Sequence, residues 1–271
     1  MSQIKGLPFR KVFEGLATVR SWMGWGGRSQ GFFIPYPYAS TIPVRDESHK
    51  IAWIDEKWRK MAPVFEAEIE RACQWNERFG QFAVEDPGNV NQPRFNQGWF
   101  PGLDGAMAYH MVRTFKPKKI LEVGSGHSTR FMAQAIQDGG LKTFLHSIDP
   151  VPRREIDSIC TQITRKTVDQ ISVEELCELE SGDMFFIDAS HILMPGTDVD
   201  YLFAEVLPRL RSGVIVHIHD IFLPLNYPNN WRWRGYNENH AVAIMLGGGN
   251  RYEVLMPNAF MRKFFSHSIA K

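Results

Sequence analysis

The stretch that decides the fold is "ILEVGSGHSTRF" at residues 120–131, which reads as a buried strand, a glycine turn and the start of a helix. Gly124 and Gly126 have no Cβ atom, so the backbone of the turn can approach a ligand closely. Ser128 or Thr129 can begin the helix that follows. A strand, a glycine-rich turn and a helix in this order are typical of an α/β protein that binds a cofactor at the turn.

Three more apolar runs follow, with helical patterns between them. The four runs are "KILEVG" at 119–124, "TFLHSID" at 143–149, "DMFFIDAS" at 183–190 and "GVIVHIHD" at 213–220. Nearly continuous apolar strands separated by helices indicate a parallel sheet that is covered on both faces. We therefore predict an α/β fold with a doubly wound, mostly parallel sheet. In such a sheet, ligands bind beyond the carboxyl ends of the strands.

The residues before these runs predict a second part of the chain. We expect a largely helical N-terminal extension over 1–103 and a cofactor-binding domain over 104–271. Asp104 is expected to cap the first helix of the domain, and Pro63 to bend or start a helix in the extension. That helix is predicted over about 53–80, because apolar residues recur there every three or four positions: Trp58, Met61, Phe65, Ile69 and Ala72.

The composition excludes several classes of protein. The 271 residues carry a formal net charge of +1, which argues against the basic surface that nucleic-acid binding needs. Cys73, Cys160 and Cys177 are widely spaced and form no CxxC pair, so neither a disulfide framework nor a cysteine zinc site is expected. The sequence has no apolar run of about 18 residues, which argues against a membrane span. We expect a reducing, cytoplasmic setting.

A basic amphipathic stretch near the N-terminus has two interpretations. Its apolar residues fall at helical spacing, and Arg10, Lys11 and Arg20 lie among them. Such a helix can lie on a membrane surface. Alternatively, the stripe packs on the protein's own core or on a partner subunit of a homo-oligomer. The apolar positions are Phe9, Phe13, Leu16, Val19 and Met23.

The glycine loop by itself does not identify the cofactor. Dinucleotide sites prefer a third glycine, G-x-G-x-x-G, and Thr129 occupies that position here. An NAD-dependent oxidoreductase is therefore disfavoured, and it stays as an alternative.

The acidic residue before the glycines gives an E-x-G-x-G pattern that resembles motif I of class I S-adenosylmethionine-dependent methyltransferases. Over roughly 95–235 the chain is similar to the bacterial branch of these enzymes called methyltransferase domain type 24. Three further segments carry this similarity: "WFPGLDGAMAYHMVR", "GDMFFIDASH" and "LPRLRSGVIVHIHDIFLP". The resemblance implies that the loop binds the amino-acid part of S-adenosylmethionine. It also implies that Asp149 binds the ribose, because a carboxylate can accept hydrogen bonds from both hydroxyls. The implied cofactor-binding residues are Glu122, Gly124, Ser125, Gly126, His127, Ser128, Asp149 and Asp188.

Asp149 also has a simpler interpretation, in which it only caps the turn before Pro150.

Four polar residues follow the third and fourth apolar runs: Asp188, His191, His219 and Asp220. If the two strands are neighbours, these side chains meet at one rim of the sheet, and we predict that they are catalytic. In one chemistry, Asp188, His219 and Asp220 hold a divalent metal (Mg²⁺, Mn²⁺ or Fe²⁺) that acidifies an acceptor hydroxyl. In the other, His191 or His219 acts as a general base without a metal.

The spacing of this cluster is similar to that of the macrocin-type sugar O-methyltransferases. The resemblance implies a magnesium site and a nearby histidine, His191, as the base. His219 stands where that group has a carboxylate, which puts Mg²⁺ in question. His217, two residues earlier, is expected to be a core histidine with a hydrogen-bond partner, and Asp198 and Asp200 are expected to begin a helix.

These observations together predict an S-adenosylmethionine-dependent O-methyltransferase of a small-molecule or glycan-like hydroxyl. Two other classes stay open besides the oxidoreductase: an iron-dependent hydroxylase-like relative and a non-catalytic protein that keeps the fold. Aromatic residues after the fourth run form a lid or an acceptor platform, or they pack against the extension. They are Tyr227, Trp231, Trp233 and Tyr236.

Overall fold

The computed structural model describes residues 36–42, 48–82, 91–152 and 155–269. The chain divides into two compact units, Met1–Arg45 and Asp46–Lys271. Within the first unit, the described residues include the short 3-10 helix η1 (Ala39–Thr41). The predicted amphipathic stretch from Phe9 to Met23 lies outside the described residues.

The second unit is built on a five-stranded sheet in the order β3-β2-β1-β4-β5, and every strand pair is parallel. This confirms the predicted α/β fold with a parallel sheet. The chain runs outward from β1 to β3 and then crosses back to β4, so the order reverses between β1 and β4. The strands are β1 (Lys119–Val123), β2 (Phe144–Ile148), β3 (Gln162–Thr164), β4 (Met184–Ile187) and β5 (Ile215–Ile218).

Strand β3 is absent from the sequence-based prediction. It has only three residues, and none of them is fully buried. Because β3 lies at the edge of the sheet, it lacks the apolar run that identifies the strands nearer the centre.

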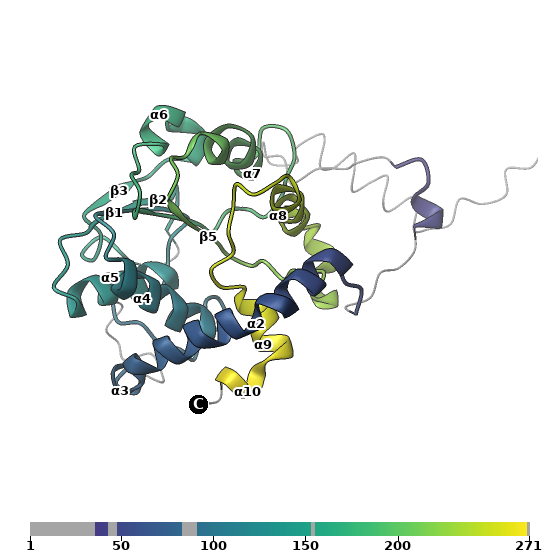
Figure 1. The fold of residues 1–271 in the computed structure, drawn as a ribbon. Helices are drawn as coiled ribbons and strands as arrows, with labels where there is room; N and C mark the ends of the chain where they lie inside the picture. The colour runs from purple at the N-terminus through teal and green to yellow at the C-terminus, as the bar shows by residue number, and fades with distance from the viewer. Residues whose placement is uncertain (1–35, 43–47, 83–90, 153–154, 270–271) are drawn as a thin grey trace, which may run out of the picture. The chain divides into compact units, whose positions relative to one another are not determined.

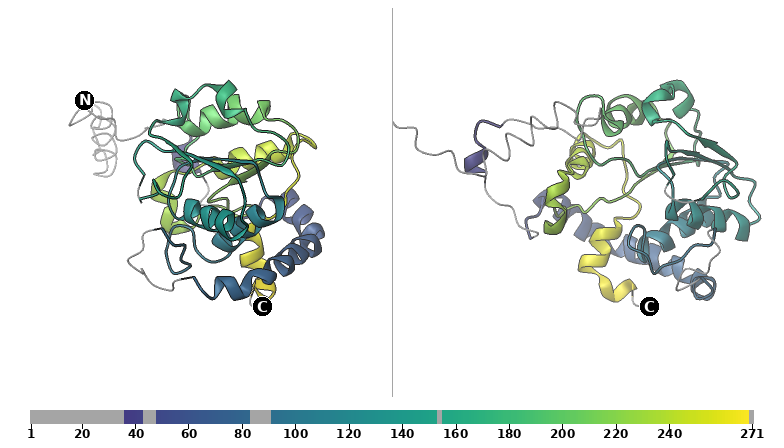
Figure 2. Two further views of the ribbon diagram at one scale, coloured as in Figure 1. Left: turned by 90° about the vertical axis from the view of Figure 1, so that its left-hand side faces the viewer. Right: turned by 180° about the vertical axis from the view of Figure 1, so that it is seen from behind.

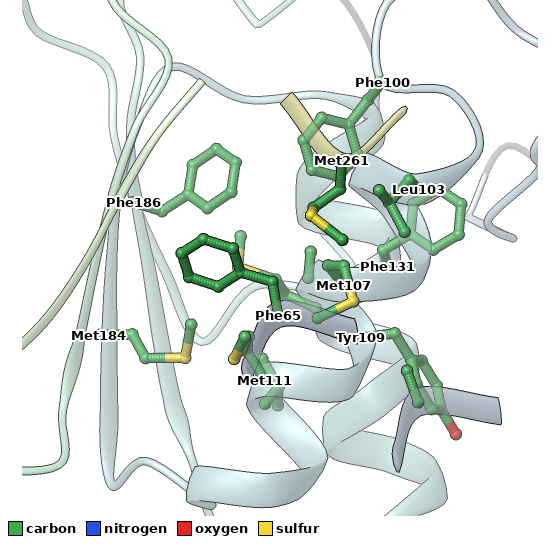
Figure 3. Packing of buried hydrophobic residues seen from close by; sticks show 14 of the residues in the cluster. Phe65, Phe100, Leu103, Met107, Tyr109, Met111, Phe131, Met184, Phe186 and Met261 are labelled. Carbon is green, nitrogen blue, oxygen red and sulfur yellow. The ribbon is translucent and has the colours of Figure 1, made fainter. Parts of the chain in front are cut away.

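Helices cover both faces of the sheet (Figures 1 and 2). One face packs against α2 (Ala52–Ala72), α4 (Leu103–Phe115) and α5 (His127–Asp138). The other face packs against α6 (Val173–Leu176) and η4 (Tyr201–Val206), which directly follows α7 (Asp198–Asp200). Figure 3 shows Met184 and Phe186 of β4 pointing toward α4, which carries Met107 and Met111.

The remaining helices lie mainly in the connections and at the C-terminal end. They are η2 (Cys73–Trp75), α3 (Asn76–Phe79), η3 (Val168–Gln170), η5 (Leu207–Arg209), η6 (Asn229–Arg234), α8 (Glu238–Gly247), α9 (Asn258–Phe264) and α10 (Ser266–Ile269). None of the helices within the described ranges has the length and apolarity needed to cross a lipid bilayer.

One helix start agrees with the prediction and one differs from it. Helix α2 begins at Ala52 and continues through Pro63, which therefore does not start it. Helix α4 begins at Leu103 after Gly102, whose φ of 53° is readily adopted only by glycine. Asp104 is consequently in the first turn rather than at the cap, and its carboxylate accepts a hydrogen bond from the Asn258 side chain at 2.9 Å.

Candidate active site

The polar residues predicted from the sequence meet at the carboxyl edge of the sheet. Backbone hydrogen bonds continue between neighbouring chains past the ends of the strands. The amide of Gly124 donates to Ile148 at 3.0 Å, that of Asp188 to Val123 at 2.9 Å, and that of His219 to Ile187 at 2.8 Å. The loops that follow β1, β4 and β5 therefore begin side by side.

Glu122 holds the end of the glycine loop through hydrogen bonds. The hydroxyls of Ser128 and Thr129 each donate to its carboxylate at 2.7 Å, and Glu122 has no exposed surface. Burial raises its pKa to about 7, although these hydrogen bonds oppose the rise. This geometry fits a residue that holds the loop, and it differs from the predicted direct contact with the cofactor.

The two glycines of the loop serve different purposes. A Cβ on Gly124 would lie 2.3 Å from the carbonyl oxygen of Asp188, so the loop after β1 packs directly against the backbone after β4. At Gly126, no other group lies within 4 Å of the corresponding position. The backbone is therefore tightly packed at Gly124 and open at Gly126, where a ligand has room to approach.

Asp149 lies at the end of β2 and faces the same loop. One carboxylate oxygen accepts a hydrogen bond from the Ser125 hydroxyl at 2.6 Å, and the other accepts one from the amide of Val151 at 2.8 Å. The second contact is the turn cap that sequence reasoning gave as an alternative. Because each carboxylate oxygen has two lone pairs, both oxygens keep acceptor capacity for a ribose.

The donors and the space at this edge fit the amino-acid and ribose parts of S-adenosylmethionine. Ser125, His127 and Ser128 follow the open turn, although His127 and Ser128 are buried. The direct contacts predicted for these residues remain predictions.

His191 is fixed by a partner that sequence reasoning missed. Its Nδ1 lies 2.7 Å from Oε2 of Glu238, the first residue of α8, and Glu238 is 0% exposed. The backbone oxygen of His191 accepts hydrogen bonds from the amides of Asn237 and Glu238 at 3.0 and 3.2 Å. The loop after β4 is therefore anchored to the start of α8.

The other nitrogen of His191 faces the two aspartates. Nε2 lies 3.5 Å from the Asp188 carboxylate and 3.6 Å from that of Asp220. Burial lowers the pKa of His191, but the hydrogen bond with Glu238 and the nearby carboxylate charges outweigh it and raise the pKa above its ordinary value. The arrangement is a carboxylate–histidine pair with one ring nitrogen directed at the open rim.

His219 is held differently. Its Nε2 lies 3.0 Å from the carbonyl oxygen of Trp99 and 3.5 Å from Asp220. A carbonyl oxygen is only an acceptor, so Nε2 carries the hydrogen and is the donor. Burial lowers the pKa of His219, but the charges of Asp188 and Asp220 dominate and raise it. These contacts leave Nδ1 as the only nitrogen of a neutral His219 ring that could act as the predicted base.

The contacts of His219 limit how it could take part in the metal site predicted with Asp188 and Asp220. Its Nε2 donates to the Trp99 carbonyl, so only Nδ1 of the neutral ring keeps a lone pair for a metal. Within the part of the chain that the structure describes, no group of three His, Cys, Asp or Glu side chains is placed to hold a metal ion. The predicted metal therefore gains no support from the described residues and stays a prediction.

The aromatic segment after β5 divides between the site and the surface. The ring of Tyr236 lies 4.7 Å from that of His191, and Tyr227 contacts Tyr236 at 5.6 Å. Trp231 packs against Tyr227 and Phe222. Trp233 is 82% exposed. Tyr236 is therefore the member of the segment placed to border an acceptor.

Two secondary predictions can be compared with the structure. Asp198 and Asp200 do begin a helix, and Thr197 caps it through a hydrogen bond from the amide of Asp200. His217 is not a paired core histidine: its ring stacks on Phe186 at 4.1 Å, and it makes no hydrogen bond to the described residues.

Residues 121–221 match the model of a family described as a methyltransferase domain. Two solved structures match the chain at low identity and low TM-score. One is the apo-structure of CmcI-N160, with 13% identity, 90% of this chain and 86% of that chain covered, and a TM-score of 0.36. The other is the SAH-bound methyltransferase PaMTH1 of Podospora anserina, with 16% identity, 85% and 95% covered, and a TM-score of 0.40. No curated protein matches the chain significantly.

Proposed function

We propose that this chain, an S-adenosylmethionine-dependent methyltransferase by the match of residues 121–221, methylates a hydroxyl oxygen of a small-molecule acceptor with His191 as the general base. The matched segment contains the glycine loop and the residues at the strand ends, whereas Glu238, the first residue of α8, lies beyond it. It confirms the predicted methyltransferase family and leaves the NAD-dependent alternative without support.

The observation that carries the proposal is the His191–Glu238 pair at the carboxyl edge of the sheet. Because Nδ1 is held by a carboxylate, the neutral ring keeps its hydrogen there and offers a lone pair at Nε2. As the acceptor oxygen is methylated, its proton moves to Nε2. The resulting imidazolium is stabilised by Glu238 and by the charges of Asp188 and Asp220.

Other residues hold and orient the reactants. Asp149 and Ser125 would bind the ribose and amino-acid parts of S-adenosylmethionine, and Gly126 leaves room for its approach. When bound, this cofactor supplies an activated methyl group on a positively charged sulfur. Tyr236 borders the base and would exclude water from one side.

The first test is calorimetric titration with S-adenosylmethionine and S-adenosylhomocysteine. Micromolar binding of both is expected, and the absence of binding to either would refute the proposal. A radiolabelled methyl group then reports transfer to a collection of hydroxyl compounds.

The matched variant for the base is His191→Asn. His191 has a φ of 63°, and asparagine adopts this conformation more readily than most residues while lacking a base. We expect cofactor binding to be kept and methyl transfer to fall about 10²- to 10⁴-fold. Full activity of His191→Asn would exclude His191 as the base.

A further inference from the structure

We propose that the cavity beside β5 is the acceptor chamber, and that its acceptor is a mainly apolar compound with a hydroxyl group rather than a sugar. The inference rests on the proposed function and deepens it. The cavity has a volume of about 500 Å³ and lies between β5, α4, α8 and residues 251–259. This volume is within the range of about 300–1,000 Å³ that holds drug-sized ligands.

The cavity and the candidate site share two residues. His219 and Asp220 line the cavity at the carboxyl end of β5, and Oδ2 of Asp220 lies 3.6 Å from Nε2 of His191. An acceptor in the cavity could therefore bring one hydroxyl to the base while its remaining atoms extend along β5.

Most of the side chains that β4, α4 and α8 place on the cavity wall are apolar, whereas Asp104, Arg251, Glu253, Asn258 and Arg262 add charged and polar groups elsewhere in the lining. The apolar part offers few hydrogen-bond partners to the several hydroxyls of a sugar, and burying a hydroxyl without a partner is unfavourable. Methionine side chains are flexible and polarisable, so such walls can adapt to an apolar ligand of irregular shape. The apolar lining includes Met107, Met111, Met184, Val242, Met245 and Leu246.

The exposure of β5 supports an open space beside it. Every residue of β4 is buried, whereas all four residues of β5 are only partly buried although β5 belongs to the same sheet. β5 is the edge strand, and its residues line the cavity. Their accessible surface therefore includes the cavity wall.

His217 supplies a polar contact in this wall. Burial lowers its pKa to about 3, so the ring is neutral and has one donor and one acceptor. Since the ring makes no hydrogen bond to the described residues, these groups are available to a ligand. We therefore expect the acceptor to carry a second polar group, away from its reactive hydroxyl, that can contact His217.

The proposal can be tested without knowing the natural acceptor. Ligand-observed NMR would measure binding of a fragment set divided equally between phenols and long-chain alcohols on one side and methyl glycosides on the other. The test variant is Met245→Trp, which fills the cavity from α8. Its control is Ile244→Trp on the same helix, because Ile244 is 75% exposed and does not line the cavity.

We expect the wild-type protein and Ile244→Trp to bind the phenols and alcohols, and Met245→Trp to bind them at least tenfold more weakly. Met111→Trp fills the cavity from α4 and provides a second variant if Met245→Trp does not fold. Binding of glycosides alone, binding that neither substitution weakens, or no binding of any fragment would overturn the inference.

Titration with S-adenosylhomocysteine separates this inference from the proposed function. If the protein binds S-adenosylhomocysteine but no apolar alcohol, the acceptor chamber is wrong and the methyltransferase proposal stands. If S-adenosylhomocysteine does not bind, the proposed function fails whatever the fragments do.

Discussion

Glu238→Gln tests the proposed base most directly, because it removes one negative charge and keeps the shape of the side chain. Glu238 is fully buried, and its Oε2 lies 2.7 Å from Nδ1 of His191. A neutral amide can still accept the hydrogen bond from Nδ1. It can also rotate and donate to Nδ1, which would move the ring hydrogen to Nε2 and remove the lone pair that accepts the substrate proton.

The size of the effect follows from the kind of hydrogen bond. A bond to a charged partner is worth about 1.5–3 kcal/mol and a neutral one about 0.5–1.5 kcal/mol. The imidazolium form of His191 therefore loses roughly 1–1.5 kcal/mol of stabilisation, which is about tenfold in the equilibrium between the charged and neutral rings. Because the wild-type contacts raise the pKa of His191, the substitution should move its titration to lower pH.

NMR titration of the ring nitrogens measures this directly and needs no acceptor. The expected result is a His191 midpoint at lower pH and a larger fraction of the tautomer with hydrogen at Nε2. With an acceptor in hand, the rising limb of the pH–rate profile should also move to lower pH, and the plateau should fall. Glu178→Gln is the control, since the Glu178 side chain is 71% exposed. An unchanged or higher midpoint in Glu238→Gln would refute the reasoning.

Three further predictions concern the loop and the rim. Burial raises the pKa of Glu122 from 4.5 to about 7. Between these two pH values the folded state binds more protons than the unfolded state. The stability of the wild-type protein therefore falls as the pH rises from 4.5 to about 7. Glu122→Gln should abolish this loss of stability, and at pH 8 its free energy of unfolding should exceed that of the wild type by up to about 3 kcal/mol. Urea unfolding measures the difference. The same pH dependence of stability in variant and wild type would contradict the prediction. Asp149→Ala should weaken S-adenosylhomocysteine binding roughly 10- to 100-fold in calorimetry, since a hydrogen bond to a charged group is worth about 1.5–3 kcal/mol; unchanged affinity would leave Asp149 with only its contacts to Ser125 and Val151. Asp220→Asn suits the φ of 54° at this position and should keep the affinity for S-adenosylhomocysteine. It should slow methyl transfer roughly tenfold or more, because it removes a negative charge that stabilises the protonated His191. Normal turnover of this variant would exclude Asp220 from the mechanism.

The sequence allowed the sheet and its functional edge to be predicted because both depend on local patterns. The four long apolar runs became β1, β2, β4 and β5, and parallel strands place their carboxyl ends together. The residues that follow these strands were therefore predicted to meet, and the distances around His191 agree for Asp188 and Asp220. No pattern of this kind marks the short edge strand β3.

Glu238 could not be predicted because its partner lies 47 positions earlier in the chain. Nothing in the local sequence distinguishes it from any acidic residue in the first turn of a helix, where such residues are common. Its position depends on how the start of α8 packs against the loop after β4, which only the tertiary structure shows. The cavity beside β5 could not be predicted from the sequence either, because elements from distant parts of the chain form it.

The two histidines near the end of β5 show why residue type and position do not by themselves assign a role. Both lie on one face of the strand, as their spacing predicts, and their rings are 6.2 Å apart. His219 donates to the Trp99 carbonyl and lies 3.5 Å from Asp220, whereas His217 is neutral and lines the cavity beside β5. Neither has the carboxylate partner at Nδ1 that orients His191. The base that we propose therefore lies in the loop after β4, and the histidines near the end of β5 line the cavity proposed for the acceptor.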